Sequence, residues 1–321
     1  MKAYMGIDIG SVSTNIVIID SNNEVMHSLY ARTNGQPIET VKKGLKEISN
    51  RLDKGVKICG VGTTGSGRQL VGIMVGADVV KNEITAHATA TSNAVSDVKT
   101  IFEIGGQDSK IIVIEDQMVT DFAMNTVCAA GTGSFLDHQA ERLGVPIEEF
   151  GSLALKAARD VRIAGRCTVF AESDMIAKQQ YGFSKAEIIN GLCQALVRNY
   201  INNLGRGKKL KPPFVFQGGV AANEGIKAAF EKEIDHEVIV PKHYDIMGAI
   251  GSAILAKDYV STENNQTNFR GFESSDLEFT PSTFKCNDCS NFCEVIKVEL
   301  EGRVVAMWQD RCGKYSSKAA V

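Results

Sequence analysis

The sequence has few of the residues from which several common kinds of site are built. Among its 321 residues are one tryptophan and five histidines, too few to favour a histidine-based metal site or an aromatic platform for nucleic-acid bases. Acidic and basic residues nearly balance, 38 against 35, so no surface for a polyanion is indicated. No apolar run approaches the ~20 residues that cross a bilayer, and the N-terminus lacks the apolar core of a signal peptide. We therefore expect a cytoplasmic globular protein that binds neither nucleic acid nor membrane.

Eight cysteines stand out in such a chain, because disulfides are rare in reducing compartments and metal or redox use is more common there. Two of them fit a packing role: Cys59 lies in a short apolar strand pattern, and Cys193 shares a helical apolar stripe with its neighbours. The other six form two groups, a pair in the middle of the chain and a set of four near its end.

Two segments about a hundred residues apart repeat one pattern. Residues 5–20 and 101–114 each give an apolar strand, a tight polar turn and a second β-branched strand, which predicts two β-hairpins. A repeated hairpin within an α/β layout predicts two related domains on either side of a cleft. We expect the first over residues 1–100, with a returning helix at about 245–258, and the second over 101–240.

Both hairpin turns are rich in glycine, whose backbone N–H groups can approach phosphates closely. A third glycine pair, between a strand and a helix, would let an adenosine lie against the backbone. The expected ATP contacts are Gly10, Ser11, Ser13 and Thr14 in the first turn, Gly105, Gly106 and Gln107 in the second, and Gly218, Gly219 and Asn223 in the third motif. Asp8 and Asp108 can each hold Mg²⁺, Asp8 through water, and Asp108 can instead position the attacking water.

In order and spacing these three motifs resemble the actin, sugar-kinase and Hsp70 ATPase superfamily, over roughly residues 1–258. The resemblance implies an α/β fold of two related domains around a nucleotide cleft. Kinases, chaperones and filaments share that scaffold, so the fold leaves the function open.

The middle pair, Cys128 and Cys167, each stand just before a predicted helix, where a helix N-terminus favours the thiolate. Small and glycine-rich flanks leave room beside each sulfur. A [4Fe–4S] cluster needs four thiolates, which two copies of the chain would supply around a two-fold axis. Alternatively, Cys128 and Cys167 bind no metal and are simply small hydrophobic side chains at the starts of two helices.

The motifs VCAAGTGSFLD and GRCTVFAESDM, together with GIDIGSVST, FEIGGQDSK and FQGGVAAN, closely resemble the ATPases that activate 2-hydroxyacyl-CoA dehydratases and the ATPase subunits of benzoyl-CoA reductase. The resemblance implies a homodimer in which Cys128 and Cys167 of both subunits hold one [4Fe–4S] cluster. It also implies that ATP hydrolysis drives single electrons from a ferredoxin or flavodoxin to an iron–sulfur acceptor enzyme.

The C-terminal end is expected to be a separate unit. Residues 261–284 are rich in polar residues and predict a solvated linker, followed by a cysteine-rich unit over 285–321. Residues 294–308 alternate and turn at 301–302, which predicts a hairpin too small to fold unaided. We expect Cys286, Cys289, Cys293 and Cys312 to bind a structural metal, Zn²⁺ rather than a second cluster, although unligated thiols on a disordered tail are the alternative.

This tail resembles those of larger activator-like proteins, including the reductases of double-cubane-cluster proteins, so the acceptor is left open. Two other functions also fit the fold. A small-molecule kinase would be colourless and would transfer phosphate, and a redox-regulated ATP-binding module would pair its cysteines in an intersubunit disulfide.

Overall fold

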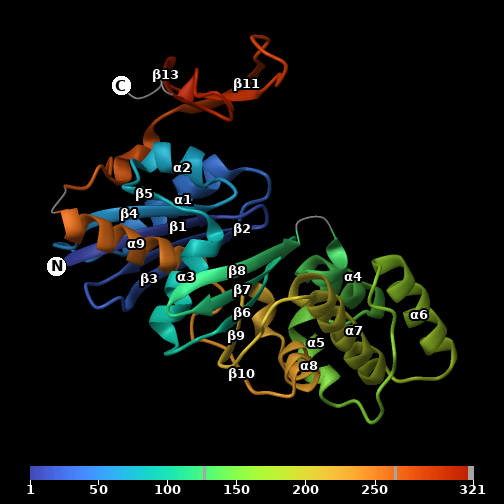
Figure 1. Ribbon diagram of the computed structural model, residues 1–321. Helices are drawn as coiled ribbons and strands as arrows, with labels where there is room; N and C mark the ends of the chain where they lie inside the picture. Colours follow the sequence, from blue (N-terminus) through green and yellow to red (C-terminus); the bar gives the residue numbers. More distant parts are fainter. Residues whose placement is uncertain (126–127, 264–265, 317–321) are drawn as a thin grey trace. The chain divides into compact units, whose positions relative to one another are not determined.

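The computed structural model describes residues 1–125, 128–263 and 266–316 (Figure 1). It consists of two compact units, each built on a mixed sheet. Unit 1 comprises Met1–Glu83 and Gly248–Val321, and unit 2 comprises Ile84–Met247. No helix in the described part of the chain is long and apolar enough to cross a membrane.

Unit 1 contains a five-stranded sheet in the order β3-β2-β1-β4-β5. Its strands are β1 (Lys2–Ile9), β2 (Ser13–Ile19), β3 (Val25–Arg32), β4 (Lys57–Gly65) and β5 (Val79–Val80). The central strands β1 and β4 run parallel, and β1 and β2 form the first expected hairpin. Both central strands are buried along almost their whole length, as strands covered on both faces must be.

Helices cover both faces of this sheet. The helices of unit 1 are α1 (Pro37–Arg51), α2 (Arg68–Val75) and α9 (Met247–Glu263). In α1 the buried Val41, Leu45 and Ile48 recur at helical spacing and join the core of unit 1. The small side chains of α9 let its backbone approach β1 and β4 so closely that a Cβ at Gly62 would lie 2.0 Å from the Ser252 carbonyl oxygen.

Unit 2 repeats the topology. Its strands are β6 (Thr100–Ile104), β7 (Ser109–Glu115), β8 (Met118–Asn125), β9 (Phe214–Gln217) and β10 (Val238–Ile239), in the order β10-β9-β6-β7-β8. In both sheets the first strand of the unit is central, its hairpin partner and the third strand lie on one side, and the later parallel strands lie on the other. The repeat expected from residues 5–20 and 101–114 therefore extends to whole sheets.

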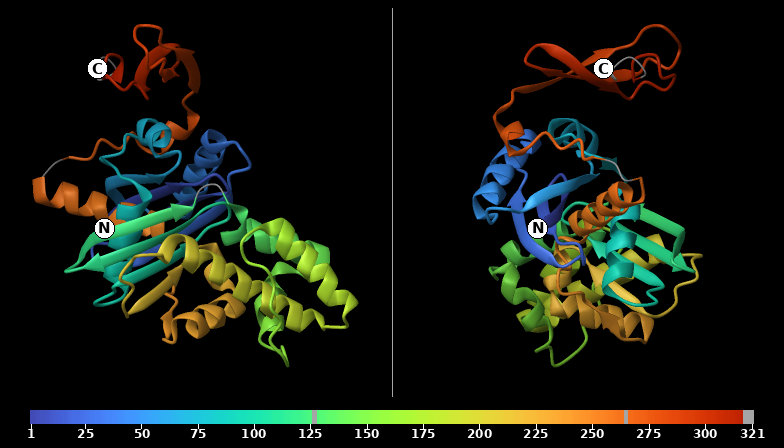
Figure 2. Two further views of the ribbon diagram at one scale, coloured as in Figure 1. Left: turned by 45° about the vertical axis from the view of Figure 1, so that its right-hand side comes forward. Right: turned by 90° about the vertical axis from the view of Figure 1, so that its left-hand side faces the viewer.

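The helices of unit 2 are α3 (Glu83–Ala94), α4 (Gly133–Leu143), α5 (Ile147–Ala154), α6 (Thr168–Gln180), α7 (Lys185–Tyr200) and α8 (Glu224–Ile234). Helices α4–α8 gather on one side of the sheet (Figure 2), where Phe102 stacks on Phe230 with ring centroids 4.7 Å apart. Ile101, the preceding residue in β6, points to the opposite face and packs with Ile84 and Ala88 of α3.

The segment expected to be a solvated linker is instead held against unit 1. The Asp78 carboxylate accepts hydrogen bonds from Thr267 Oγ1 and the Asn268 N–H, both at 2.7 Å. The short helix η4 (Phe272–Asp276) packs on α1, and β11 (Phe279–Lys285) begins inside the expected linker. Apolar side chains scattered through this polar stretch, Phe269, Phe272 and Leu277, account for the docking because they pack against the core of unit 1.

The C-terminal sheet also packs on unit 1 rather than standing apart. Strand β11 pairs with β12 (Glu294–Leu300), which forms the expected hairpin with β13 (Arg303–Trp308) around Glu301–Gly302. Phe279 and Val298 are buried in the same core as β1, with Trp308 packed against it. Contact with unit 1 therefore supplies apolar burial that the isolated tail would lack.

Candidate functional site

Two glycine turns of the same construction follow the first strand of each unit. In the β1–β2 turn the Gly10 N–H donates to the Ser13 carbonyl at 2.8 Å, and in the β6–β7 turn the Gly105 N–H donates to the Asp108 carbonyl at 3.0 Å. Because these N–H groups close the turns, contacts with phosphates would fall to the residues at the tips, Ser11 in one and Gln107 in the other.

A threonine that sequence reasoning missed braces the first turn. Thr33, directly after β3, donates from Oγ1 to the Gly10 carbonyl at 3.0 Å, and its N–H donates to the Val12 carbonyl at 2.8 Å. Its hydroxyl also lies 3.0 Å from that of Thr14. Thr33 thus holds the turn carbonyls, which leaves the outer rim of the turn to a ligand.

Asp8 stands near the end of β1, opposite Asn15 on β2 and Thr64 on β4. The Thr64 hydroxyl is buried and has no hydrogen-bond partner among the described residues. Gly65, at φ +90°, passes so close that a Cβ there would lie 2.6 Å from Asp8 Oδ1. A half-buried carboxylate beside an unpartnered hydroxyl suits a hydrated Mg²⁺, so the residues present fit this ion.

In the second turn, Gln107 is exposed at the tip and Asp108 is partly exposed behind it. Asp108 Oδ2 lies 3.0 Å from Lys110 Nζ, which also lies 2.9 Å from Glu103 Oε2. Ser109 carries a buried hydroxyl with no partner among the described residues, at the position that follows the aspartate. This turn therefore presents an oriented carboxylate at a polar, partly exposed end of the central strands.

The third motif lies beside the second turn within unit 2. Gly218 follows β9 at φ +89°, and its N–H donates to the Tyr244 carbonyl at 2.7 Å. Gly219 has open space where a side chain would be. Asn223 serves a purpose the sequence analysis did not assign, because its side-chain oxygen accepts from the Ile226 N–H at 3.1 Å and caps α8.

Cys128 is half-buried, and a short helical turn separates it from the long helix that was expected to follow it directly. It precedes the single turn η1 (Ala129–Gly131), and α4 begins only at Gly133. The helix-dipole argument from the sequence therefore does not apply to Cys128 directly. Its backbone is fixed instead by the Asn125 side chain, which accepts from the Cys128 N–H at 2.9 Å and donates to its carbonyl at 2.7 Å.

Cys167 is half-buried and occupies the N-cap position of α6, as the sequence indicated. Helix α7 contacts both the loop that carries Cys167 and the segment that carries Cys128. The buried Asn199 donates from Nδ2 to the Gly165 carbonyl at 2.5 Å, and its Oδ1 would lie 3.1 Å from a Cβ on Gly131. One side chain thus touches both cysteine-bearing segments, a role that helical periodicity alone could not distinguish from core packing.

The Cys128 segment is also bonded to the second glycine turn. The N–H groups of Gly133 and Ser134, at the start of α4, donate to the carbonyls of Gly105 and Gly106 at 2.9 and 2.8 Å. The Ser134 hydroxyl donates to the same Gly106 carbonyl at 2.5 Å. A displacement of this turn would therefore reach the helix that follows Cys128.

The remaining cysteines differ sharply in environment. Complete burial raises the pKa of Cys193 to about 12, which agrees with the packing role expected for it. In the tail, Cys286 is buried and its thiol lies 3.4 Å from Asp288 Oδ2, whereas Cys289 and Cys312 are exposed. Within the described ranges, no three Cys, His, Asp or Glu side chains are grouped as they would be around a metal ion.

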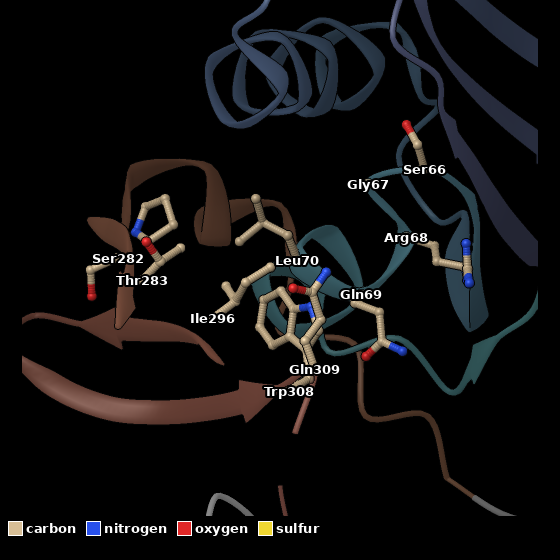
Figure 3. A pocket seen from close by; sticks show the side chains of 11 residues that line it. Ser66, Gly67, Arg68, Gln69, Leu70, Ser282, Thr283, Ile296, Trp308 and Gln309 are labelled. Atoms are coloured by element: carbon tan, nitrogen blue, oxygen red, sulfur yellow. The ribbon is translucent and has the colours of Figure 1, made fainter. Parts of the chain in front are cut away.

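A pocket of ≈ 760 Å³ lies between the tail and the start of α2 (Figure 3). Ile296 and Trp308 line it from the tail, and Gln69 and Leu70 line it from α2. The loop preceding α2 is bonded to the end of β1, where the Gly67 N–H donates to the Ile9 carbonyl at 3.1 Å. The tail therefore adjoins the loop that is bonded to Ile9, the residue after Asp8.

Residues 5–256 match the sequence model of the BadF/BadG/BcrA/BcrD ATPase family. The (R)-2-hydroxyglutaryl-CoA dehydratase activating ATPase of Acidaminococcus fermentans is 35% identical over 261 residues, covering 80% of this chain and 98% of that protein. The activator of the 2-hydroxyisocaproyl-CoA dehydratase from Clostridium difficile, solved with bound ADPNP, gives a TM-score of 0.74 at 31% identity, covering 82% of this chain and 97% of that one.

A ROK family glucokinase from Streptomyces griseus gives a TM-score of 0.50 at 13% identity, covering 80% of this chain and 99% of that one, and it shares the fold alone. The expected α/β fold of the sugar-kinase type is thereby confirmed. The cysteine-rich tail lies beyond the residues that the family model matches.

Proposed function

Because the chain belongs to the BadF/BadG/BcrA/BcrD ATPase family, we propose that it is a reductive activator, which uses ATP hydrolysis to pass single low-potential electrons to a partner iron–sulfur enzyme. The observation that carries the proposal is the pair of half-buried cysteines, Cys128 and Cys167, on segments joined through Asn199. The other features of the chain supply a nucleotide site and a physical link from it to these cysteines.

For MgATP, each unit offers its own candidate contacts: the β1–β2 turn of unit 1 and the β6–β7 turn of unit 2 for phosphates, and the third motif of unit 2 for the adenosine. Asp8 suits the metal through water because an unpartnered hydroxyl, that of Thr64, adjoins it. Asp108 suits the attacking water or the metal, since it stands at a phosphate turn with its carboxylate oriented by Lys110. Gly219 leaves the open backbone against which an adenosine would lie.

A [4Fe–4S] cluster fits the two cysteines on chemical grounds. Neither thiol is in a disulfide, both are partly accessible, and each chain supplies half of the four thiolates required. When bound, the cluster supplies a one-electron couple. Two copies of the chain related by a two-fold axis would then share it, in a homodimer whose interface includes both cysteine segments.

The surface beside Cys167 supports a protein partner at this place. Val169 and Phe170, in the first turn of α6, are 62% and 64% exposed, and Ile176 farther along the helix is 45% exposed. Large apolar side chains gathered on one exposed helix favour an interface. The second subunit would cover part of this face, and the acceptor enzyme would dock beside the shared cluster, because electrons must leave from it.

The link between hydrolysis and the cysteines would run through the start of α4. The Gly105 and Gly106 carbonyls accept hydrogen bonds from Gly133 and Ser134, so release of the terminal phosphate from the turn would be felt by the segment carrying Cys128. Nucleotide can drive such a change only if it binds the two arrangements unequally.

Iron analysis of anaerobically purified protein tests the proposal. The wild-type chain should be brown, dimeric and loaded with about two irons per chain. Cys128→Ala and Cys167→Ala should each lose this iron and weaken the dimer, whereas Cys59→Ala, which removes a half-buried thiol from unit 1, should retain both. A double variant, Cys128→Ala/Cys167→Ala, that still binds about two irons per chain would refute the cluster assignment.

For the acceptor we propose a 2-hydroxyacyl-CoA dehydratase, with an aryl-CoA reductase and a double-cubane-cluster protein as the alternatives. A ferredoxin or flavodoxin would supply the electron. An anaerobic assay with each acceptor distinguishes them, because only the true partner should both increase the rate of ATP hydrolysis and be reduced as ATP is consumed.

We also propose the tail as a zinc site, although no three of its cysteines are grouped as they would be around a metal ion in the described structure, so binding would have to draw the thiols together. The Cys286 N–H donates to the Cys293 carbonyl at 2.8 Å, which continues the β11–β12 ladder and supports opposite placement of these residues. Lys314 pairs with Asp288 and Tyr315 packs on Phe284, so the segment that carries Cys312 is tied to this loop. Metal analysis of the intact chain and of Cys286→Ser tests this, and equal zinc content in the two would refute it.

A further inference from the structure

A buried lysine sits between two carboxylates at the second glycine turn. Lys110 Nζ lies 2.9 Å from Glu103 Oε2 and 3.0 Å from Asp108 Oδ2. The side chains of Lys110 and Glu103 are 3% and 6% exposed, and that of Asp108 is 34% exposed. One end of this group is therefore enclosed in the protein, and the other end opens at the proposed phosphate site.

Glu103, the enclosed end, touches both glycine motifs of unit 2. A Cβ on Gly218 would lie 2.8 Å from Glu103 Oε1, and a Cβ on Gly105 would lie 3.4 Å from the same oxygen. In the sheet, Glu103 pairs with Lys110 on one side and with Gln217, the residue before Gly218, on the other. The lysine thus closes a continuous row that joins the phosphate turn to the adenosine motif.

Charge pairing explains how these groups can be buried together. A buried carboxylate is tolerated only with a cation beside it, and a buried ammonium needs acceptors for its protons. Lys110 meets both demands, while Tyr200 donates to its backbone carbonyl from the opposite side. Burial raises the pKa of Tyr200, so this phenol stays protonated and remains a donor. The exposed member of the group is Asp108.

We propose that Lys110 is a positioning residue for ATP hydrolysis. By bonding Asp108 it fixes the carboxylate that faces the attacking water or the metal, and by bonding Glu103 it makes the turn at Gly105 and the motif at Gly218 move as one body. The inference rests on the proposed function, since it assigns Asp108 a step in hydrolysis.

Three variants test it. Lys110→Met removes the ammonium but keeps the length of the side chain. Glu103→Gln/Lys110→Met also removes the charge that the first change leaves buried. Lys211→Met is the matched control, because Lys211 also pairs with a β7 carboxylate, that of Glu115, at the exposed surface of unit 2. For each, we would measure the kcat and KM of MgATP hydrolysis, the affinity for a non-hydrolysable ATP analogue, and the thermal midpoint.

We expect Lys110→Met to lose at least about tenfold in kcat, because a misplaced catalytic group costs that much or more, and to melt at a lower temperature. The double variant should regain most of the thermal midpoint and analogue affinity, yet keep the loss in kcat. Lys211→Met should match the wild type throughout.

Recovery of kcat together with stability in the double variant would show that Lys110 is only structural and would overturn the inference. So would a wild-type kcat in Lys110→Met. A wild-type protein that does not hydrolyse ATP would defeat the proposed function, and this inference with it, whereas either of the two preceding results defeats this inference alone.

Discussion

Adding one methyl group at Gly218 should separate two roles of the third motif. The residue lies at φ +89° and ψ 168°, a region that is essentially restricted to glycine. A Cβ there would lie 2.4 Å from the Ile104 carbonyl oxygen, which belongs to the rigid central strand β6. Neither the strand nor the turn can withdraw without breaking the row of contacts along Glu103, so Gly218→Ala should be strained.

The cost follows from two terms. Holding alanine in this backbone region costs about 1–3 kcal/mol, and forcing an extra methyl into packed surroundings costs a further ~1–3 kcal/mol. Together they predict a loss of roughly 2–6 kcal/mol in the free energy of unfolding. For domains of about 150–250 residues, each kcal/mol lowers the thermal midpoint by ~2–4 °C, so we expect a fall of at least about 4 °C.

Gly219→Ala is the matched control, because a Cβ at Gly219 meets nothing within 4 Å. Calorimetry should find the thermal midpoint of this variant close to that of the wild type. If adenosine lies against this backbone, however, the added methyl should weaken binding of a non-hydrolysable ATP analogue. Equal thermal midpoints for Gly218→Ala and Gly219→Ala would refute the steric reasoning, and unchanged affinity in Gly219→Ala would remove adenosine from this position.

Three further perturbations test other parts of the molecule. A hydrogen bond from Arg159, together with one from the Ser184 N–H, lowers the pKa of Glu187 to about 2. The contribution of the ionised Glu187 to stability is therefore complete above about pH 4.5 and disappears as the pH falls through about 2. Melting curves should therefore find Glu187→Gln destabilised at neutral pH, with the gap closing toward pH 2, and a constant gap would contradict this. Trp308→Ala should make the tail cleavable by protease before the rest of unit 1, because it removes a ring that packs on the core of that unit. Unchanged resistance of the tail to protease would argue against its docking. Ser134→Ala removes a hydrogen bond worth about 0.5–1.5 kcal/mol and should lower the electrons delivered per ATP by up to about tenfold, which the ratio of acceptor reduction to hydrolysis would reveal.

The repeated hairpins could be predicted because each is encoded locally. Alternating β-branched residues on both sides of a short glycine turn leave few other structures open, and residues 5–20 and 101–114 form the β1–β2 and β6–β7 hairpins. The order of the other strands followed only from the resemblance to a known fold. Strand β8, the edge of its sheet, has both faces largely exposed and so gives no clear alternation for a sequence argument.

The docked linker could not be predicted, because its polar composition hides three apolar side chains that only the tertiary structure brings to the core. Helix α3 was missed for a related reason: it is rich in alanine and threonine and shows no apolar stripe, since residues on several of its sides are buried. The contacts of Lys110, Asn199 and Thr64 depend on strand register and helix packing. Single-sequence patterns identify such residues as plausible core or surface positions and cannot assign their partners.

Under the proposed function, a nucleotide-dependent movement of the second glycine turn should displace Cys128 and Cys167 by different amounts, because the two are connected to it differently. Backbone hydrogen bonds tie the start of α4, and with it the Cys128 segment, directly to the carbonyls of the Gly105–Gly106 turn. The Cys167 loop is held instead by Asn199, on a helix whose next residue, Tyr200, bonds the Lys110 carbonyl. The connection from the turn to the Cys128 segment is short and made of backbone hydrogen bonds, whereas the connection to the Cys167 loop passes through side chains of α7. Because backbone hydrogen bonds have little freedom to adjust, a shift of the turn should displace the Cys128 segment more than the Cys167 loop. The thiolates of Cys128 and Cys167, which would hold the cluster, would then shift relative to each other, and a change in the surroundings and hydrogen bonding of its ligands is what tunes the potential of such a group.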